Sequence, residues 1–319
     1  MRAKGKLVWW AFALTLVAGC NQIFGLDLPA REEPTDARDH DAVDLDAAAD
    51  RDGDGVLDDD DLCPDVADPG QFDEDGDARG DRCDLCPHLA QLDDTDGDED
   101  NIPDACDPYE RIAGGRLRWS GFHGAEELGD WRALGSGTAT WTDDAIELAP
   151  VLDGEARFVR VEPADPAMTR TRVIASVEIG APNAGSVARR TVGLVTNVEP
   201  QVGNNLFLCQ LETDVPQPDV RLAEYRIESP VAATILASSI GTQFPLGEVT
   251  LEFDIGADDD TDMTQGAFCQ VNGVTGARTL PRTTVVDLPP GLAGVRTVGV
   301  PLRVRWAVVI DHPSLETTD

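Results

Sequence analysis

The chain has 319 residues and a formal net charge of −35, because 60 Asp and Glu residues stand against 25 Lys and Arg residues. This excess of negative charge opposes binding to nucleic acid, whose phosphates would be repelled. The charge is concentrated in residues 31–110, where 31 acidic residues and five arginines account for 26 of the net negative charges. We therefore expect an acidic N-terminal part and a far less charged C-terminal part.

Residues 1–19 are typical of a secretion signal. Three basic residues precede an apolar run over residues 7–17, which is too short to span a membrane as a helix. The ending Val17-Ala18-Gly19-Cys20 resembles the lipobox of bacterial lipoproteins, which implies cleavage before Cys20 and lipidation of that residue. A chance cysteine after an ordinary signal peptide is the alternative.

Lipid on Cys20 would bind the protein to a membrane, since several acyl chains on one residue anchor stably. We therefore expect a lipid-anchored protein of the bacterial cell envelope, at the outer membrane or the cell surface. Residues 20–49 contain two prolines and many Ala and Asp residues without apolar periodicity. This composition predicts a disordered acidic tether.

One acidic pattern occurs three times between residues 50 and 107. Each copy has Asp at relative positions 1, 3, 5, 9 and 12. This spacing folds a short loop around a hard, oxygen-seeking cation, with a backbone carbonyl from position 7. The pattern therefore predicts calcium as the cofactor; a solvated acidic linker is the alternative. The expected ligands are Asp50, Asp52, Asp54, Val56, Asp58, Asp61, Asp73, Asp75, Asp77, Asp81, Asp84, Asp96, Asp98, Asp100, Asp104 and Asp107.

Position 6 of each copy must turn the chain sharply with a positive φ. Gly55 does this without steric cost, whereas Ala78 and Asn101 hold that position in the other two copies. Asn tolerates the left-handed region better than Ala does. If the three loops share one geometry, the second loop should be the weakest.

Four cysteines repeat with the same period as the Asp pattern. Cys63 and Cys83 lie 20 residues apart, and so do Cys86 and Cys106. In an exported chain such spacing predicts a disulfide framework. Four cysteines allow three connectivities, of which the internal symmetry favours Cys63–Cys83 and Cys86–Cys106. The Cys83-Asp84-Leu85-Cys86 run is alternatively a redox or zinc motif, although the surrounding negative charge opposes thiolate formation.

Residues 50–111 resemble the thrombospondin type 3 repeat. The resemblance rests on the combined Asp and Cys spacing, on Gln71-x-Asp73-x-Asp75 and on Asp81-x-Cys83-Asp84. It implies a calcium-filled, disulfide-stapled segment with little regular secondary structure. Such a segment has too few apolar residues to build its own core.

In residues 112–312, alternation of apolar and polar residues with a period of two dominates. No long stretch with a period of 3.6 competes, so the pattern predicts an antiparallel β-sandwich followed by a tail over residues 313–319. On the last run, Leu302, Val304, Trp306, Val308 and Ile310 are expected on one face. The expected strand runs are 173–179, 191–198, 205–211, 225–229, 249–255, 267–271 and 302–310.

Cys209 and Cys269 lie on the expected inward faces of two of these strands. In an oxidising compartment a bridge between strands is favoured over two buried thiols. With Cys20 carrying lipid, the other six cysteines could all form pairs.

The C-terminal part resembles a concanavalin-A-like sandwich of the laminin-G or legume-lectin type. Its motifs include Trp119-Ser120-Gly121-Phe122, Val192-Gly193-Leu194-Val195 and Cys269-Gln270-Val271-Asn272-Gly273. Calcium repeats before such a sandwich are similar to the C-terminal half of thrombospondins, which serves adhesion. The resemblance implies adhesion, through recognition of a polysaccharide or surface-protein ligand. A purely structural envelope protein is the alternative.

A run from Glu252 to Ala257 resembles the Glu-x-Asp-x-x-Glu strand of retaining glucanases and galactanases that share this fold. Retaining hydrolysis needs two carboxyl groups about 5 Å apart. Because Ala257 replaces the second Glu, we expect no enzyme, and a polysaccharide hydrolase is the least favoured alternative. Glu252 and Asp254 are then expected as outward polar residues of a strand.

Overall fold

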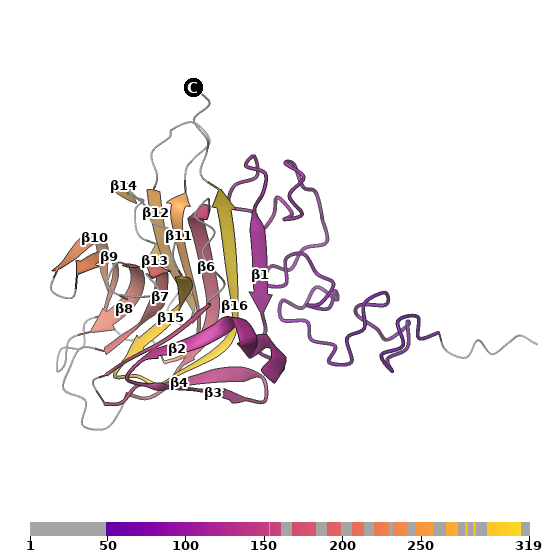
Figure 1. Cartoon of the computed structure of the whole chain (residues 1–319), viewed down its shortest axis with the longest axis horizontal. Coiled ribbons are helices and arrows are strands. Elements are labelled where there is room, and N and C mark those ends of the chain that lie inside the picture. Colours follow the sequence, from indigo (N-terminus) through magenta and orange to yellow (C-terminus); the bar gives the residue numbers. More distant parts are fainter. Residues whose placement is uncertain are drawn as a thin grey trace, which may run out of the picture. The chain divides into compact units, whose positions relative to one another are not determined.

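The alternating runs of the C-terminal part form two antiparallel β-sheets, which pack face to face as a β-sandwich (Figure 1). The described residues belong to one unit, Ala48–Asp319. The expected signal, Cys20, residues 20–48 and residues 314–319 lie outside them. The computed structural model describes residues 49–152, 154–160, 168–182, 190–198, 206–213, 220–229, 232–241, 246–257, 266–273, 278–279, 283–284 and 292–313.

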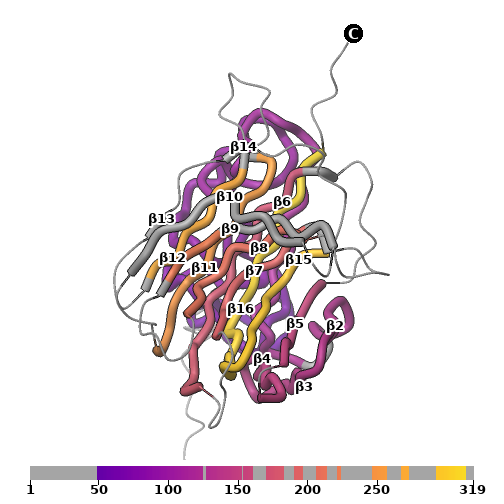
Figure 2. The backbone as a smooth tube through the Cα atoms, turned by 90° about the vertical axis from the view of Figure 1, so that its left-hand side faces the viewer, coloured from indigo at the N-terminus to yellow at the C-terminus, as the bar shows by residue number. Residues whose placement is uncertain are grey.

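The nine-stranded sheet, here called sheet A, has the order β13-β12-β11-β6-β16-β4-β3, with β1 paired to β16 and β14 paired to β12. Figure 2 shows β6, β11 and β12 side by side. The strands of sheet A are β1 (Arg116–Ser120), β3 (Thr138–Thr142), β4 (Ala145–Ala149), β6 (Met168–Ile179), β11 (Gly247–Ala257), β12 (Gly266–Gly273), β13 (Arg278–Thr279), β14 (Thr283–Thr284) and β16 (Leu302–Pro313).

The seven-stranded sheet, here called sheet B, has the order β10-β9-β8-β7-β15-β5-β2. A short 3₁₀ helix, η1 (Ala125–Asp130), precedes β2. Within the described residues no helix is long and apolar enough to cross a membrane. The strands of sheet B are β2 (Trp131–Gly135), β5 (Glu155–Arg160), β7 (Arg190–Val198), β8 (Leu206–Thr213), β9 (Val220–Ser229), β10 (Ala232–Gly241) and β15 (Leu292–Val298).

Each run expected from the sequence lies in a strand over its described residues, and inward residues from six of the seven runs contribute to one core between the sheets. Val173, Ala175 and Val177 of β6 are fully buried in this core. The Cys209–Cys269 disulfide crosses it and joins β8 of sheet B to β12 of sheet A. Strands β1 to β5, β10 and β13 to β15 were not among those expected from the sequence. The first five have only five or six residues each, so their alternation is weak.

Strand β16 does not keep one face toward the core. Its register with β6 shifts between Val304 and Trp306, which is where a β-bulge inserts an extra residue. Leu302 and Val304 lie in the core before the bulge. Beyond the bulge, the residues that lie in the core are Ala307 and Val309. Trp306, Val308 and Ile310 therefore face the opposite side of sheet A. The expectation of a single face for this run is wrong, because one extra residue reverses a period of two.

Part of the outer face of sheet A, on β6 and β16, is covered by the acidic segment, residues 50–111, rather than by solvent. Figure 1 shows the loops of this segment beside β1. A small apolar cluster forms at the contact, because a segment with few apolar residues can bury them only against another element. Its buried members are Cys86, Ile102 and Cys106 of the segment with Ile174, Trp306, Val308 and Ile310 of the sheet.

Candidate calcium sites

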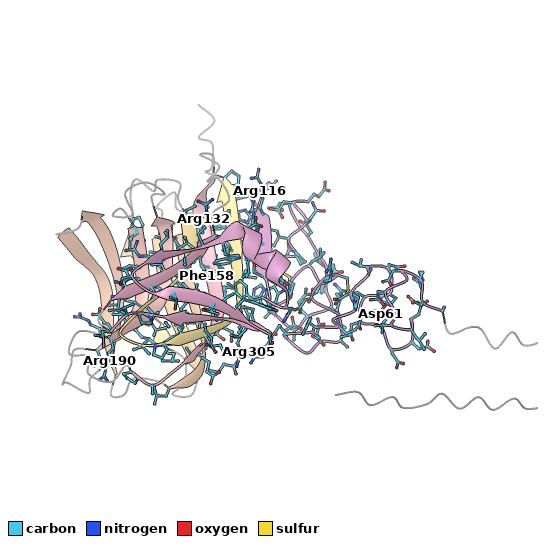
Figure 3. The ribbon with its side chains drawn as sticks, turned by 60° about the horizontal axis from the view of Figure 1, so that its bottom comes forward. Asp61, Arg116, Arg132, Phe158, Arg190 and Arg305 are labelled. Atoms are coloured by element: carbon cyan, nitrogen blue, oxygen red, sulfur yellow. A yellow bond between two sulfur atoms is a disulfide. The ribbon has the colours of Figure 1, made fainter. Side chains whose placement is uncertain are left out.

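The three acidic loops share one arrangement of carboxylates. In each, the side chains at positions 1, 3 and 5 converge, with one oxygen of each lying within 4.8 Å of the others. Figure 3 shows Asp61 of the first loop among irregular loops, away from Phe158 in the strands. The converging groups are Asp50, Asp52 and Asp54; Asp73, Asp75 and Asp77; and Asp96, Asp98 and Asp100.

The position 1 carboxylate organises each loop through backbone N–H groups. In the first loop, the N–H of Gly53 donates to one oxygen of Asp50 over 2.8 Å, and the N–H of Gly55 donates to the other over 3.1 Å. The same two bonds recur on Asp73 and Asp96. Because these backbone bonds form in all three loops, the turn is kept even though position 6 is Gly in the first loop, Ala in the second and Asn in the third.

Positions 4 and 6 both adopt positive φ in all three loops. Ala78 has φ 75° and Asn101 has φ 74° where Gly55 has φ 98°. At position 4, Glu99 has φ 65° where the other loops have glycine. From the sequence, only position 6 was expected to need a positive φ. A side chain in this region costs about 1–2 kcal/mol, so the second and third loops both carry conformational strain.

The position 9 carboxylate closes each loop onto its own start. One oxygen of Asp58 accepts the N–H of Arg51 over 2.8 Å, and Asp81 and Asp104 accept from position 2 in the same way. The backbone N–H of position 9 also donates to the carbonyl preceding position 1. These three residues therefore stabilise the closed loop through hydrogen bonds to its backbone. Their role as direct ligands stays a prediction.

The position 12 carboxylate lies beside the converging group. Burial raises the pKa of the position 3 carboxyl in each loop, and the position 12 charges of Asp61, Asp84 and Asp107 add to that rise. One oxygen of each accepts the N–H two residues further on. The N–H of Val56 at position 7 donates to Asp54, and its carbonyl stays a predicted ligand.

The position 3 carboxylates fit a bound cation better than they fit an empty loop. Asp52 and Asp75 each bury one oxygen without a hydrogen-bond partner among the described residues, and Asp98 buries both. Burial raises the pKa of Asp75 and of Asp98 to about 6. Buried carboxylate oxygens without partners are unfavourable unless a cation compensates them. An all-oxygen set of this kind suits calcium.

Two disulfides brace the loops in the pairs that the repeat symmetry favoured. Cys63 bonds Cys83 with Cα atoms 5.7 Å apart, and Cys86 bonds Cys106 with Cα atoms 6.0 Å apart. Since Cys83 and Cys86 bond different partners, they do not form a dithiol. The redox and zinc alternatives for this run therefore fail in the oxidised protein.

Asp254 does not face solvent as the sequence analysis expected. Its carboxylate is 1% exposed and accepts bonds from the Tyr109 hydroxyl over 2.8 Å and from Arg172 over 2.8 and 3.0 Å. Glu252 lies 3.6 Å from Arg172 and is partly buried. The expectation for Asp254 was wrong because Tyr109 of the acidic segment covers this part of sheet A. Tyr109, which follows the third loop, was missed because its partners lie far along the chain.

A pocket of about 490 Å³ lies between the second and third loops and strand β1. Its walls combine carboxylates, arginines and one side of Trp119, which is partly exposed. Pockets of about 300–1,000 Å³ with a few convergent polar groups are typical of small-molecule sites. The lining residues are Asp81, Asp84, Leu85, Pro87, Asp100, Asn101, Ile102, Gly115, Arg116, Leu117, Arg118 and Trp119.

No family model matches the chain, and no curated protein matches it. Among solved structures, it is similar to the Ca²⁺/Man-bound exoplasmic/lumenal domain of VIP36, with 12% identity and a TM-score of 0.45 over 64% of this chain and 92% of that one. Peanut lectin has 10% identity and a TM-score of 0.46 over 62% and 98%. A Bacillus subtilis protein of unknown function with a galectin-like fold has 12% identity and a TM-score of 0.41 over 61% and 94%. These similarities concern the fold alone.

Proposed function

We propose that this chain is a lipid-anchored, calcium-binding protein of the bacterial cell envelope, whose sandwich recognises a polysaccharide or a surface protein. The observation that carries the calcium proposal is the recurrence of one loop three times with buried position 3 oxygens that lack partners. The expected thrombospondin-type repeats agree with this arrangement. Calcium would neutralise part of the acidic segment and would allow it to stay on sheet A.

Calorimetric titration of the full chain with calcium tests this proposal. We expect three sites with dissociation constants of roughly 0.1–1 mM, as in other extracellular calcium modules. Asp52→Asn should remove the first site, whereas Asp60→Asn should not, because Asp60 is exposed and lies outside the repeated pattern. Binding of the same number of ions by both variants would contradict the assignment.

The proposed anchor is the lipid on Cys20, which lies outside the described residues. The intact mass of the mature protein should show a chain that begins at Cys20 and carries acyl groups. Cys20→Ser should abolish both the cleavage and the acylation. A mature chain with another N-terminus and no lipid would reject the anchor.

For recognition, the pocket beside β1 is of a suitable size and carries an aromatic side chain with polar groups around it. A glycan array probed with and without calcium tests this part of the proposal. Two of the calcium loops contribute to the pocket walls, so ligand binding should weaken when calcium is chelated. Absence of binding to any glycan or surface protein would leave the structural role as the alternative.

We propose that the sandwich is not catalytic. Asp254 is supported here as a structural residue, since Tyr109 and Arg172 occupy its oxygens and it is nearly inaccessible. A retaining hydrolase needs two accessible carboxyl groups. Release of reducing ends from mixed polysaccharides, if it disappeared in Glu252→Gln, would defeat this proposal.

A further inference from the structure

A fourth group of metal-ligating side chains joins the third loop to the last strand. His312 in β16 lies with Asp100 and Asp107 so that one ligand-type atom from each lies within 4.8 Å of the others. The imidazole is completely buried, and the two carboxylates are each 1% exposed. Unlike the three loops, this group offers a nitrogen.

Both nitrogens of His312 face hydrogen-bond acceptors. Nδ1 lies 3.1 Å from the carbonyl oxygen of Ile112, and Nε2 lies 3.0 Å from Oδ1 of Asp107. A neutral imidazole carries one N–H, so an Nδ1–H bonded to the carbonyl leaves a lone pair on Nε2. Nε2 makes no hydrogen bond within the described residues despite this proximity. A lone pair 3.0 Å from a carboxylate oxygen is repulsive, unless a cation lies beside both atoms.

The backbone of Gly115 packs directly against two of the proposed ligands. A Cβ atom at this position would lie 2.4 Å from Oδ2 of Asp100 and 2.5 Å from Nε2 of His312, closer than real Cβ atoms approach other atoms. The backbone N–H of Gly115 also donates to Oδ2 of Asp100 over 2.7 Å. A side chain at this position would therefore displace two of the ligand atoms.

We propose that His312, Asp100 and Asp107 bind a divalent transition-metal ion of the zinc class. Zinc binds imidazole nitrogen and carboxylate oxygen at about 2.0–2.2 Å, which places neighbouring ligand atoms about 3–4 Å apart. The 3.0 Å between Nε2 and Asp107 matches this spacing. The contact of Nδ1 with the Ile112 carbonyl is the outer-shell bond that orients metal-bound histidines.

Calcium is a poorer occupant of this group, since it prefers oxygen ligands, whereas imidazole suits zinc and similar ions. The inference rests on the proposed calcium function to the extent that Asp100 and Asp107 also belong to the third loop. A zinc ion here would share or replace the ligands of that loop. It would also connect the acidic segment to the sandwich through a metal bond to β16.

The test titrates the full chain, saturated with calcium, with Zn²⁺ by calorimetry and with Co²⁺ as a visible-absorption probe. We expect one tight zinc site and a cobalt spectrum typical of nitrogen coordination. His312→Gln should weaken zinc binding by more than about 100-fold, beyond the 10–100-fold typical of outer-shell changes. Gly115→Ala should weaken it while retaining all three ligands.

His123→Gln is the matched control. His123 also lies 3.2 Å from an Asp, Asp81, in the second repeat, but it belongs to no such ligand group within the described residues. It should leave zinc affinity unchanged. Equal zinc affinity in the wild type and in His312→Gln would overturn the inference.

Nitrogen-15 NMR of histidine in the wild type tests the same point without a substitution. A metal-bound Nε2 is expected for His312, and a doubly protonated ring in the zinc-loaded protein would overturn the inference. Calcium titration of the same samples separates the two proposals. If His312→Gln loses zinc binding and keeps calcium binding, the zinc site is supported. If the wild type binds no calcium, the proposed calcium sites in the loops are refuted instead.

Discussion

Removal of the Asp254 carboxylate should destabilise the contact between the acidic segment and sheet A. In Asp254→Ala, the guanidinium of Arg172 loses two bonds and the hydroxyl of Tyr109 loses its 2.8 Å acceptor. Both groups remain at a buried contact. Removing one partner of a buried ion pair typically costs about 3–5 kcal/mol.

The cost should lie at the lower end of that range. The Arg172 side chain is 22% exposed and keeps Glu252 within 3.6 Å, so part of its charge remains compensated. Tyr109 keeps a longer contact with the Ile255 carbonyl. We expect a loss of about 3–4 kcal/mol in the free energy of unfolding, and about 1 kcal/mol for Tyr109→Phe, which deletes one hydrogen bond.

Urea unfolding followed by tryptophan fluorescence measures these losses at about 5 mM calcium, above the expected dissociation constants. Glu178→Ala is the control, because Glu178 lies on neighbouring β6 and is exposed, so its loss should stay within about 0.5 kcal/mol. The double variant of Asp254 and Tyr109 should lose less than the sum of the single variants. A loss for Asp254→Ala no larger than the control would refute the buried-contact reasoning.

Three further predictions concern the loops and the core. Because burial raises the pKa of Asp75 and of Asp98 from 3.8 to about 6, the calcium-free fold binds these protons more tightly than the unfolded chain. This stabilisation should be complete below pH 3.8 and lost as the pH rises through about 6. With calcium bound, thermal unfolding should show no such decrease in stability over this pH range. Ala78→Gly should stabilise the second loop by about 0.5–1 kcal/mol and tighten its calcium binding about two- to fivefold, since φ there is 75°; unchanged calorimetric affinity would contradict this. Replacing Cys209 and Cys269 together by Ala should cost about 4 kcal/mol, as the chain-entropy relation gives for a separation of 60 residues, and an unchanged denaturation midpoint would argue against the bridge.

The sequence predicted the strands of the core well where the alternation was long. β6 and β11 have the expected inward residues, because a strand with one buried face must repeat with a period of two. β16 departs from this pattern at its bulge between Val304 and Trp306. The residue types there do not indicate a bulge, because beyond it both faces of β16 are apolar and buried, so the sequence pattern does not show which face is inward.

The polar face of sheet A could not be interpreted from the sequence. Asp254 and Ser176 have the positions and polarity of solvent-facing strand residues, yet they are 1% and 2% exposed. Asp254 is covered by Tyr109, 145 residues earlier in the chain, and Ser176 donates to Glu248 on the neighbouring strand. Local patterns report which residues share a face, and they do not report what covers it.

The sequence by itself determined the local features of this protein. The Asp spacing fixes which carboxylates converge, because positions 1, 3 and 5 are close in any loop that closes with backbone bonds to position 1. The Cys period likewise favours the disulfides within the segment. Only the tertiary structure decided the long-range features, namely the burial of Asp254 and the approach of His312 to Asp100 and Asp107. Such contacts depend on how two separately patterned segments pack, and neither segment carries that information in its own periodicity.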